Sequence, residues 1–328
     1  MRWFARRLAF YVFAIWVALT VNFLLPRLMP GSPIAGLLQH LSPAQLQANP
    51  GLIQTYQALL GGGHHSIWSD YVTYLHRISH FDFGLSTSNY PTKVSEVVGR
   101  TLPYSIFLVG VGFLLAFALG IAVGMVAAWR RGGFVDGIVV PAFMMVSAFP
   151  AFFVALLALY LLGLKAGWFP IQHAYGNGVT PGFSWTFLTS ALRHSELPIL
   201  VIVLTYAGGW VLNMRTVMIN TIGEDYVALA HAKGLPDRKV MTRYAGRNAI
   251  LPPLNGFAAL FASAVGGLVF IEFIFSYPGV GYTLQSAVLG NDYPLAQAIL
   301  VVLSVCVIVA NLVMDLLNFV LDPRLRAS

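Results

Sequence analysis

The cationic side chains of this chain concentrate in one polar segment, residues 224–252, between two long apolar runs. Only 9% of the 328 residues are charged and 58% are apolar, so a segment this polar must lie in water beside a membrane. Its basic residues are Lys233, Arg238, Lys239, Arg243 and Arg247. Those at 239, 243 and 247 are four residues apart and would share one helix face. The segment therefore offers a contact surface, either for a partner protein or for anionic lipid.

Histidines are the second set of residues that could do chemistry. His76 and His80 are four residues apart, and a His64-His65 pair precedes them. Imidazoles on one helix face can ligate a transition metal. Neither Asp70 nor Asp82 falls at a spacing that completes a ligand set, and no cysteine is near. We therefore interpret these histidines as exposed loop residues and expect no metal site.

Motifs for other chemistry are absent from the sequence. It has no Gly-x-x-x-x-Gly-Lys-Ser/Thr phosphate loop, no His-Glu-x-x-His and no Gly-x-Ser-x-Gly. The acidic residues are few and scattered, which disfavours a membrane enzyme acting on lipid-linked substrates. Cys306 is the only cysteine and lies in an apolar run, where packing is its expected role. We expect no catalytic residue in this chain, and any energy must come from a partner.

The elements that must position these residues are membrane helices. The mean hydropathy is +0.74. The net charge of +7 does not indicate nucleic-acid binding, because the charges cluster beside the apolar runs. We predict an all-α polytopic membrane protein with six transmembrane helices in the lipid bilayer. The predicted spans cover residues 8–25, 102–129, 138–164, 198–214, 254–275 and 295–320.

The basic residues also predict how these helices are oriented. With both termini in the cytoplasm, 13 of the 19 Lys and Arg residues lie on the cytoplasmic side, as the positive-inside rule requires. No small-x-small cleavage pattern follows the first apolar run, so we expect a retained helix and no signal peptide. This orientation puts residues 222–252 in the cytoplasm, between helices four and five.

We expect three parts in the chain: an N-terminal transmembrane helix (1–30), an extracytoplasmic segment (31–100) and a five-helix core (101–328). The extracytoplasmic segment should contain an amphipathic helix opened by Ser42-Pro43 and a short helix around residues 68–74. The loop at about 222–252 is predicted as a helical hairpin broken by Gly234, with Pro236 in the first turn of its second helix.

A family resemblance rests on this loop. An acidic residue, alanines at helical spacing, a glycine and a distant Leu-Pro resemble the coupling loop of permease subunits of binding-protein-dependent ABC importers. The surrounding Glu-Asp-Tyr-Val and Ala-Lys-Gly-Leu look like the dipeptide, oligopeptide and nickel class, although His231 departs from the usual pattern. In that family the loop docks into a cytoplasmic ATPase subunit. The resemblance assigns this role to Glu224, Asp225, Tyr226, Ala228, Ala232, Lys233, Gly234, Leu251 and Pro252.

The resemblance also implies partners and a location. It implies a second homologous permease, two ATPase domains that bind ATP and Mg, and an extracytoplasmic substrate-binding protein. The implied location is a bacterial or archaeal cytoplasmic (inner) membrane, and this chain itself would hold no cofactor. A membrane scaffold or receptor that uses the hairpin only to dock a partner is the alternative from another class.

Two further sets of residues are candidates for the transport pathway. The residues of one set could line a weakly polar passage, although small and polar residues equally permit close helix packing. Its members are Ser147, Pro150, Tyr206, Asn213 and Ser263. The other set forms a Pro-Gly turn that resembles an outer gate in the same class, with an ordinary surface loop as the alternative. Its members are Tyr277, Pro278, Gly279 and Gly281.

The cargo is the least determined property. The class resemblance implies di- or oligopeptides first. Oligosaccharide is a close alternative, because four segments look like the sugar-handling members: 275–282, Asp292-Tyr293-Pro294, Gly208-Gly209-Trp210 and Met214-Arg215. Nickel is a third possibility within the same class.

Overall fold

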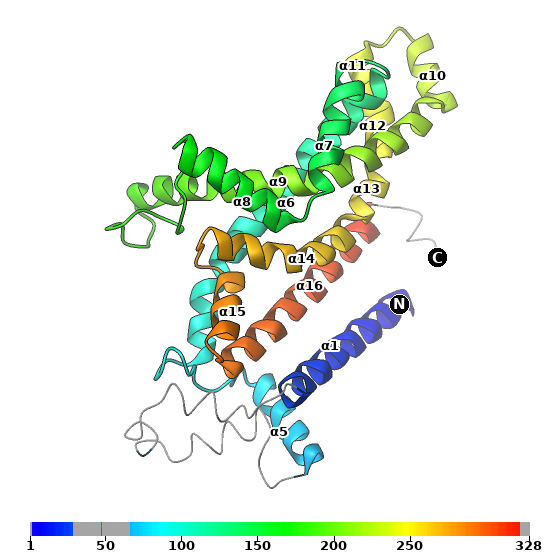
Figure 1. Cartoon of the computed structure of the whole chain (residues 1–328). Coiled ribbons are helices and arrows are strands. Elements are labelled where there is room, and N and C mark those ends of the chain that lie inside the picture. Colours follow the sequence, from blue (N-terminus) through cyan, green and yellow to red (C-terminus); the bar gives the residue numbers. More distant parts are fainter. Residues whose placement is uncertain (1, 29–46, 48–65, 322–328) are drawn as a thin grey trace. The chain divides into compact units, whose positions relative to one another are not determined.

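A computed structural model describes residues 2–28, 47 and 66–321 of the chain, most of them in helices (Figure 1). The only β-type pairing in the described residues is an isolated bridge between Leu85 and Lys93. The chain divides into two compact units: Met1–Tyr104 with Pro278–Leu312, and Ser105–Tyr277 with Val313–Ser328. The predicted helix at Ser42-Pro43, the His64-His65 pair and the C-terminal residues 322–328 lie outside the described residues.

The predicted apolar spans coincide with helices. Helices α6 (Val94–Trp129), α9 (Trp185–Ile222) and α16 (Tyr293–Leu321) are long and apolar enough to cross a membrane. A fourth candidate is a broken pair, Val135–Ser147 and Ala151–Lys165, bent by 106°. The apolar parts of α1 (Arg2–Leu28) and α14 (Phe257–Ile274) are shorter, covering Ala9–Leu24 and Ala264–Ile274. This architecture is that of a multi-pass membrane protein.

The first unit contains α1, α5 (Ile67–Ser79), the start of α6, α15 (Val280–Leu289) and most of α16. Asn22 of α1 and Gln297 of α16 are buried, and each side-chain amide donates to the other's backbone carbonyl, at 2.9 and 3.1 Å. Phe23 of α1 packs against Tyr71 and Tyr74 of α5. The short helix predicted around residues 68–74 is therefore present as α5.

Asp292 organises the loop between α5 and α6. Its buried carboxylate caps α16 by accepting from the Leu295 amide at 3.2 Å. It also accepts from the Ser86 hydroxyl at 2.5 Å and the Ser88 amide at 2.9 Å. Two segments more than two hundred residues apart in sequence are thereby joined by one carboxylate.

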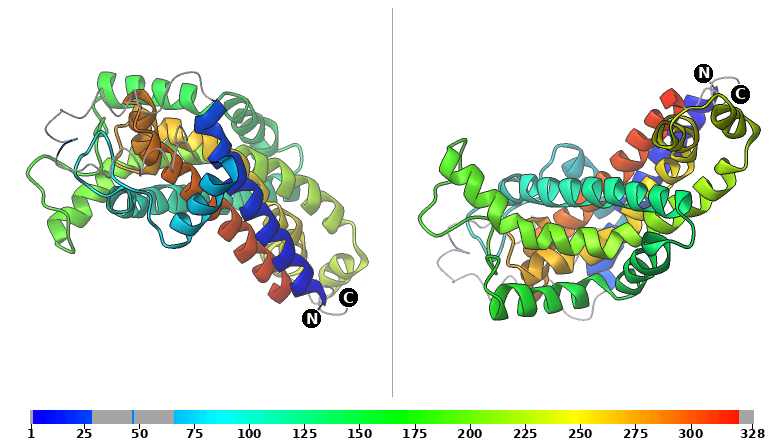
Figure 2. Two further views of the ribbon diagram at one scale, coloured as in Figure 1. Left: turned by 90° about the horizontal axis from the view of Figure 1, so that it is seen from below. Right: turned by 90° about the horizontal axis from the view of Figure 1, so that it is seen from above.

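The second unit is built on parallel packing of α6 and α9, which lie side by side in Figures 1 and 2. The contact requires glycine on α6: a methyl group on Gly124 would come within 2.6 Å of the Val211 carbonyl oxygen and 2.8 Å of the Met214 Cβ. Such close approach of backbones is how apolar helices associate without a hydrophobic driving force.

The bent helix pair of the second unit is interrupted between Ser147 and Ala151, within the predicted span 138–164. It comprises η1 (Val135–Val139), α7 (Val140–Ser147), α8 (Ala151–Ala158) and η2 (Leu159–Lys165). Pro150 precedes α8 with an extended backbone (φ −57°, ψ 140°), since a residue with no N–H readily occupies a helix start. The π-helical segments η1 and η2 were not predicted.

Two helix boundaries correct the sequence analysis. Helix α9 begins at Trp185, capped by the Ser184 hydroxyl, so residues 185–197 are helical and not part of a loop. Pro198 lies inside α9 and buried, which shows that it does not start the span. Helix α6 likewise begins at Val94, ahead of the predicted start at 102, with Pro103 inside it. Both helices thus continue through a proline despite its tendency to end a helix, and α9 has a capping serine as well.

Candidate functional site

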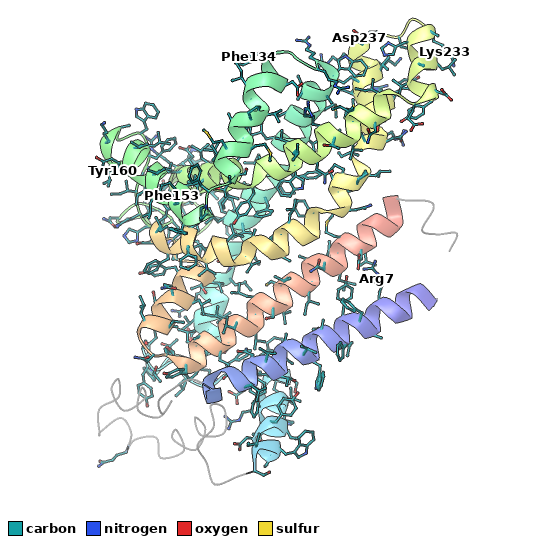
Figure 3. The ribbon with its side chains drawn as sticks, turned by 45° about the vertical axis from the view of Figure 1, so that its right-hand side comes forward. Arg7, Phe134, Phe153, Tyr160, Lys233 and Asp237 are labelled. Carbon is teal, nitrogen blue, oxygen red and sulfur yellow. The ribbon has the colours of Figure 1, made fainter. Side chains whose placement is uncertain are left out.

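The segment that the sequence singled out folds as a helical hairpin at one end of the second unit, with Lys233 and Asp237 near its tip (Figure 3). Its first arm is α10 (Asp225–Ala232), and Glu224 occupies the cap position with an extended backbone (φ −77°, ψ 145°). The Glu224 carbonyl accepts from the amides of Val227 and Ala228 at 2.9 and 3.3 Å. Acidic side chains at this end suit the helix dipole.

Gly234 ends α10 in a left-handed conformation, with φ +69°. The Leu235 amide donates to the Ala230 carbonyl at 3.4 Å, and the Gly234 amide donates to the His231 carbonyl at 2.8 Å. This pair of bonds is a Schellman motif, in which glycine is favoured because other residues are strained at positive φ. The predicted break at Gly234 is confirmed.

The second arm returns through α11 (Asp237–Lys239), η3 (Val240–Ala245), α12 (Gly246–Ala249) and α13 (Leu251–Asn255). Pro236 precedes α11, and its carbonyl accepts from Lys239 and Val240 amides at 2.8 and 3.1 Å. Leu251 and Pro252 form the first turn of α13. The π-helical turn of η3 lies within the basic stripe at 239, 243 and 247, so this stripe departs from the regular helix that the sequence predicted.

Burial divides α10 into two faces. Val227 and Ala230 are 0% and 2% exposed and belong to a core with Met214 and Met218 of α9 and Ala245 of η3. The opposite face is exposed. It carries Tyr226, Ala228, Leu229, Ala232 and Lys233. Leu229 is 56% exposed, so α10 is anchored to the second unit while presenting an amphipathic outer surface.

An ion pair joins α9 to the start of the bent helix pair, and an aromatic contact joins α6 to the hairpin. The Arg215 guanidinium of α9 donates to the Asp136 carboxylate of η1, with Nε–Oδ1 and Nη2–Oδ2 distances of 2.5 and 3.2 Å. Trp129, at the end of α6, stacks on His231 of α10 with ring centroids 5.7 Å apart. His231, a departure from the family pattern, thus contacts the end of α6.

The candidate pathway residues lie in the second unit, and those with defined contacts are at helix crossings. Ser147 is pressed against α9, because a methyl group on Gly208 would come within 2.2 Å of its Oγ. The Tyr206 hydroxyl donates to the Ala264 carbonyl of α14 at 3.3 Å, beside Gly267. Asn213 is half-buried on α9, Pro150 is exposed, and the Ser263 side chain lies outside the described residues. Their part in a transport pathway stays a prediction.

An aromatic cluster in the second unit was missed by the sequence analysis. Trp210 of α9 is fully buried and stacks on Phe257 of α14 with ring centroids 5.5 Å apart. Phe113 and Phe117 of α6 approach the Trp210 ring edge-on, each at 5.6 Å. The aromatic residues were visible in the sequence, but no periodicity links helices that are so far apart along the chain.

The candidate outer gate falls where the two units divide, between Tyr277 and Pro278. Tyr277 is buried, and its amide donates to the Glu272 carbonyl at 2.8 Å, which ends α14. Gly279 caps α15, and its carbonyl accepts from the Thr283 amide and hydroxyl at 3.1 and 2.8 Å. Gly281 is buried within α15. The turn before α15 lies at Phe275 and Ser276, while Gly279 is extended, so the predicted Pro-Gly turn is displaced toward α14. The gating role stays a prediction.

His76 lies in the last turn of α5, and His80 is the C-cap of that helix. His80 Nδ1 lies 2.8 Å from the His76 carbonyl, and the rings are 4.6 Å apart. Within residues 2–28 and 66–321, no three His, Cys, Asp or Glu side chains are grouped as metal ligands would be.

Comparison with known proteins identifies the class. Residues 120–327 match the family described as binding-protein-dependent transport system inner membrane component, and the chain belongs to that family. It is therefore the membrane-embedded permease component of an ABC importer, a multi-pass membrane protein.

Relatives match nearly the whole chain. A protein of Brucella suis biovar 1 (strain 1330) named "putative peptide permease protein" is 32% identical over 95% of both chains. The oligopeptide transport system permease protein AppB of Bacillus subtilis (strain 168) is 29% identical over 93% of both chains. The oligopeptide transport system permease protein OppB of Escherichia coli (strain K12) is 28% identical over 99% of both.

Proposed function

We propose that this chain is a peptide-importing permease subunit whose 222–252 hairpin docks the ATPase that drives transport. The observation that carries the proposal is the division of α10 into an anchored face and an exposed face. Val227 and Ala230 fix the helix to α9, while Leu229 and Tyr226 remain 56% and 36% exposed. An apolar side chain this exposed, on a rigid helix and among polar neighbours, is a typical protein contact.

The proposed topology has six transmembrane helices with both termini in the cytoplasm. The short apolar helices α1 and α14 would cross together with α6, the bent pair, α9 and α16. The distribution of basic residues supports this orientation. It places the hairpin and the arginines that end α6 at the same membrane face, in a bacterial or archaeal inner membrane.

The proposed complex contains a second homologous permease, two ATPase domains that bind ATP and Mg, and an extracytoplasmic binding protein. This chain would be noncatalytic and hold no cofactor. ATP binding would draw the ATPase domains together, and the docked hairpin would transmit that movement to α9 through Val227 and Ala230. The peptide names of the relatives favour peptide over oligosaccharide or nickel as cargo.

ATP hydrolysis by the complex reconstituted in lipid tests the transport role. Binding protein loaded with peptides should stimulate hydrolysis, whereas short oligosaccharides should leave it at the basal rate. Stimulation by oligosaccharides alone would show that the cargo is an oligosaccharide and not a peptide. A complex that binds its ATPase but responds to neither cargo would support the scaffold alternative.

A variant of the exposed face tests the docking role. Leu229→Asp should weaken ATPase binding at least tenfold, because a charge replaces an apolar contact. Asn248→Asp is the matched control: it adds the same charge at an exposed position of the hairpin outside the predicted docking residues. Equal ATPase affinity of the two variants would contradict docking through α10.

A further inference from the structure

A groove opens between the end of α6, the end of α9 and α10, all within the second unit. It encloses about 720 Å³ including its open mouth. Its walls come from Ala128, Trp129, Arg130, Arg131, Ile219, Ile222 and His231. Part of the lining is apolar, and the rest is aromatic or cationic.

The charged residues that line the groove are two arginines. Arg130 and Arg131 are exposed at the end of α6, and His231 faces them from α10. No acidic residue is among the described residues that line the groove. Two carboxylates lie close to these groups: Asp237 Oδ1 is 3.8 Å from His231 Nδ1, and Asp136, which pairs with Arg215, also interacts with Arg131. The groove is thus suited to an anion.

The apolar part of the groove distinguishes its ligand from a small soluble anion. Ala128 is buried and Ile219 and Ile222 are half-buried, so one wall is hydrocarbon. Trp129 lies at the junction, where an apolar helix gives way to two arginines. Tryptophan and arginine at the end of a membrane helix occupy the headgroup level of a bilayer.

We propose that this groove binds the phosphate-bearing headgroup of an anionic phospholipid. The arginines contact the phosphate, Ile219 and Ile222 pack against the first methylenes of an acyl chain, and Trp129 lies between the two. Because Trp129 also stacks on His231, the bound lipid links the bilayer to the docking hairpin. The inference rests on the proposed orientation, in which α6 ends at the cytoplasmic face.

Lipid retention by the purified complex tests this inference. Native mass spectrometry would count phosphatidylglycerol and phosphatidylcholine molecules retained by wild type and by Arg130→Gln/Arg131→Gln. Each arginine near an anionic surface contributes about fivefold in affinity, so the double variant should bind phosphatidylglycerol roughly 25-fold more weakly. Lys239→Gln/Arg243→Gln is the matched control, since it removes two exposed charges of the neighbouring hairpin, outside the groove.

Each outcome of this experiment either supports or contradicts the lipid site. Preferential retention of phosphatidylglycerol that is lost in the groove variant and kept in the control supports the site. Equal loss in both variants would show diffuse attraction to basic residues and overturn it. Competition by millimolar glycerol 3-phosphate as effective as that by the lipid would assign the groove to a soluble phosphate instead. Peptide-stimulated ATP hydrolysis, measured separately, shows whether the importer itself functions, so failure of the lipid site and failure of the proposed function are distinguishable.

Discussion

The guanidinium of Arg215 forms two hydrogen bonds with the carboxylate of Asp136, joining the middle of the second unit to the start of its bent helix. Asp136 also accepts from the Gly132 amide at 2.9 Å, so the turn after α6 is fixed by the same carboxylate. The two side chains are only 28% and 10% exposed. Removing one partner of such a pair destabilises the folded protein, because the remaining charge would be poorly solvated.

Arg215→Gln should therefore destabilise the protein by about 1.5–3 kcal/mol, the range for hydrogen bonds to charged groups. Arg100→Gln is the control, because Arg100 pairs with Glu96 within α6 while both side chains are largely exposed, at 74% and 49%. Pairs of that kind contribute at most about 1 kcal/mol. Thermal unfolding of the two purified variants compares their losses of stability. Identical unfolding midpoints would show that the Arg215–Asp136 pair contributes no more than the exposed Arg100–Glu96 pair.

Gly208→Ala should separate α7 from α9. The added methyl group would lie 2.2 Å from the Ser147 Oγ and 2.8 Å from the Phe143 carbonyl oxygen. Overpacking of this kind costs about 1–3 kcal/mol. The neighbouring Gly209 has no atom within 4 Å of a methyl group, so Gly209→Ala is a control of identical chemistry.

Unfolding midpoints of these two glycine variants give the comparison. Gly209→Ala should be neutral or slightly stabilising, since alanine favours a helix over glycine. A Gly208→Ala protein as stable as wild type would mean that the two helices are not in close contact. Adding Ser147→Gly to Gly208→Ala should restore part of the loss, because it removes the closest clash.

Gly234→Val should uncouple ATP hydrolysis from transport or prevent assembly with the ATPase. A residue with a Cβ costs roughly 1–2 kcal/mol in the left-handed region, and a β-branched side chain is worse. The two hydrogen bonds of the Schellman motif would break, and the orientation of α10 relative to α11 would no longer be fixed. We expect either loss of ATPase assembly or hydrolysis that no longer responds to loaded binding protein.

Gly223→Val is the control for that experiment. Gly223 lies just before α10 with φ −76°, a value that any residue adopts, and a methyl group there meets only the Asn220 carbonyl, at 3.5 Å. It should keep cargo-stimulated hydrolysis. Wild-type transport by Gly234→Val would refute the coupling role of this turn.

Asp292→Ala should loosen the loop before α6. It removes the acceptor of the Ser86 hydroxyl and of the Ser88 and Leu295 amides. Loss of a helix cap and of buried partners together should cost about 2 kcal/mol or more. Hydrogen exchange at Ser88 should accelerate, whereas Asp82→Ala, which removes one exposed bond to the Gly84 amide, should leave Ser88 protected. Unchanged exchange at Ser88 in the Asp292 variant would contradict this role.

The sequence by itself determined the class of protein and the local structure of the hairpin. Long apolar runs have one solution in lipid, a helix that satisfies its own backbone, so composition alone predicts the membrane helices. Gly234 and Pro236 likewise act on their immediate neighbours, and the break between α10 and α11 was readable from them. Local rules failed at Pro198, because a capping serine and tertiary packing sustain α9 through it.

Tertiary structure decided which of those residues meet. The Arg215–Asp136 pair and the Asp292–Ser86 bond join residues 79 and 206 positions apart in the chain. Val227 and Ala230 pack back on α9, the helix that directly precedes α10. It also placed Ser147 and Tyr206 at helix crossings. There they contribute to helix packing, whether or not they also line a transport pathway. Helix periodicity fixes which residues share a face but not which helix that face contacts, since that depends on the packing of all helices together.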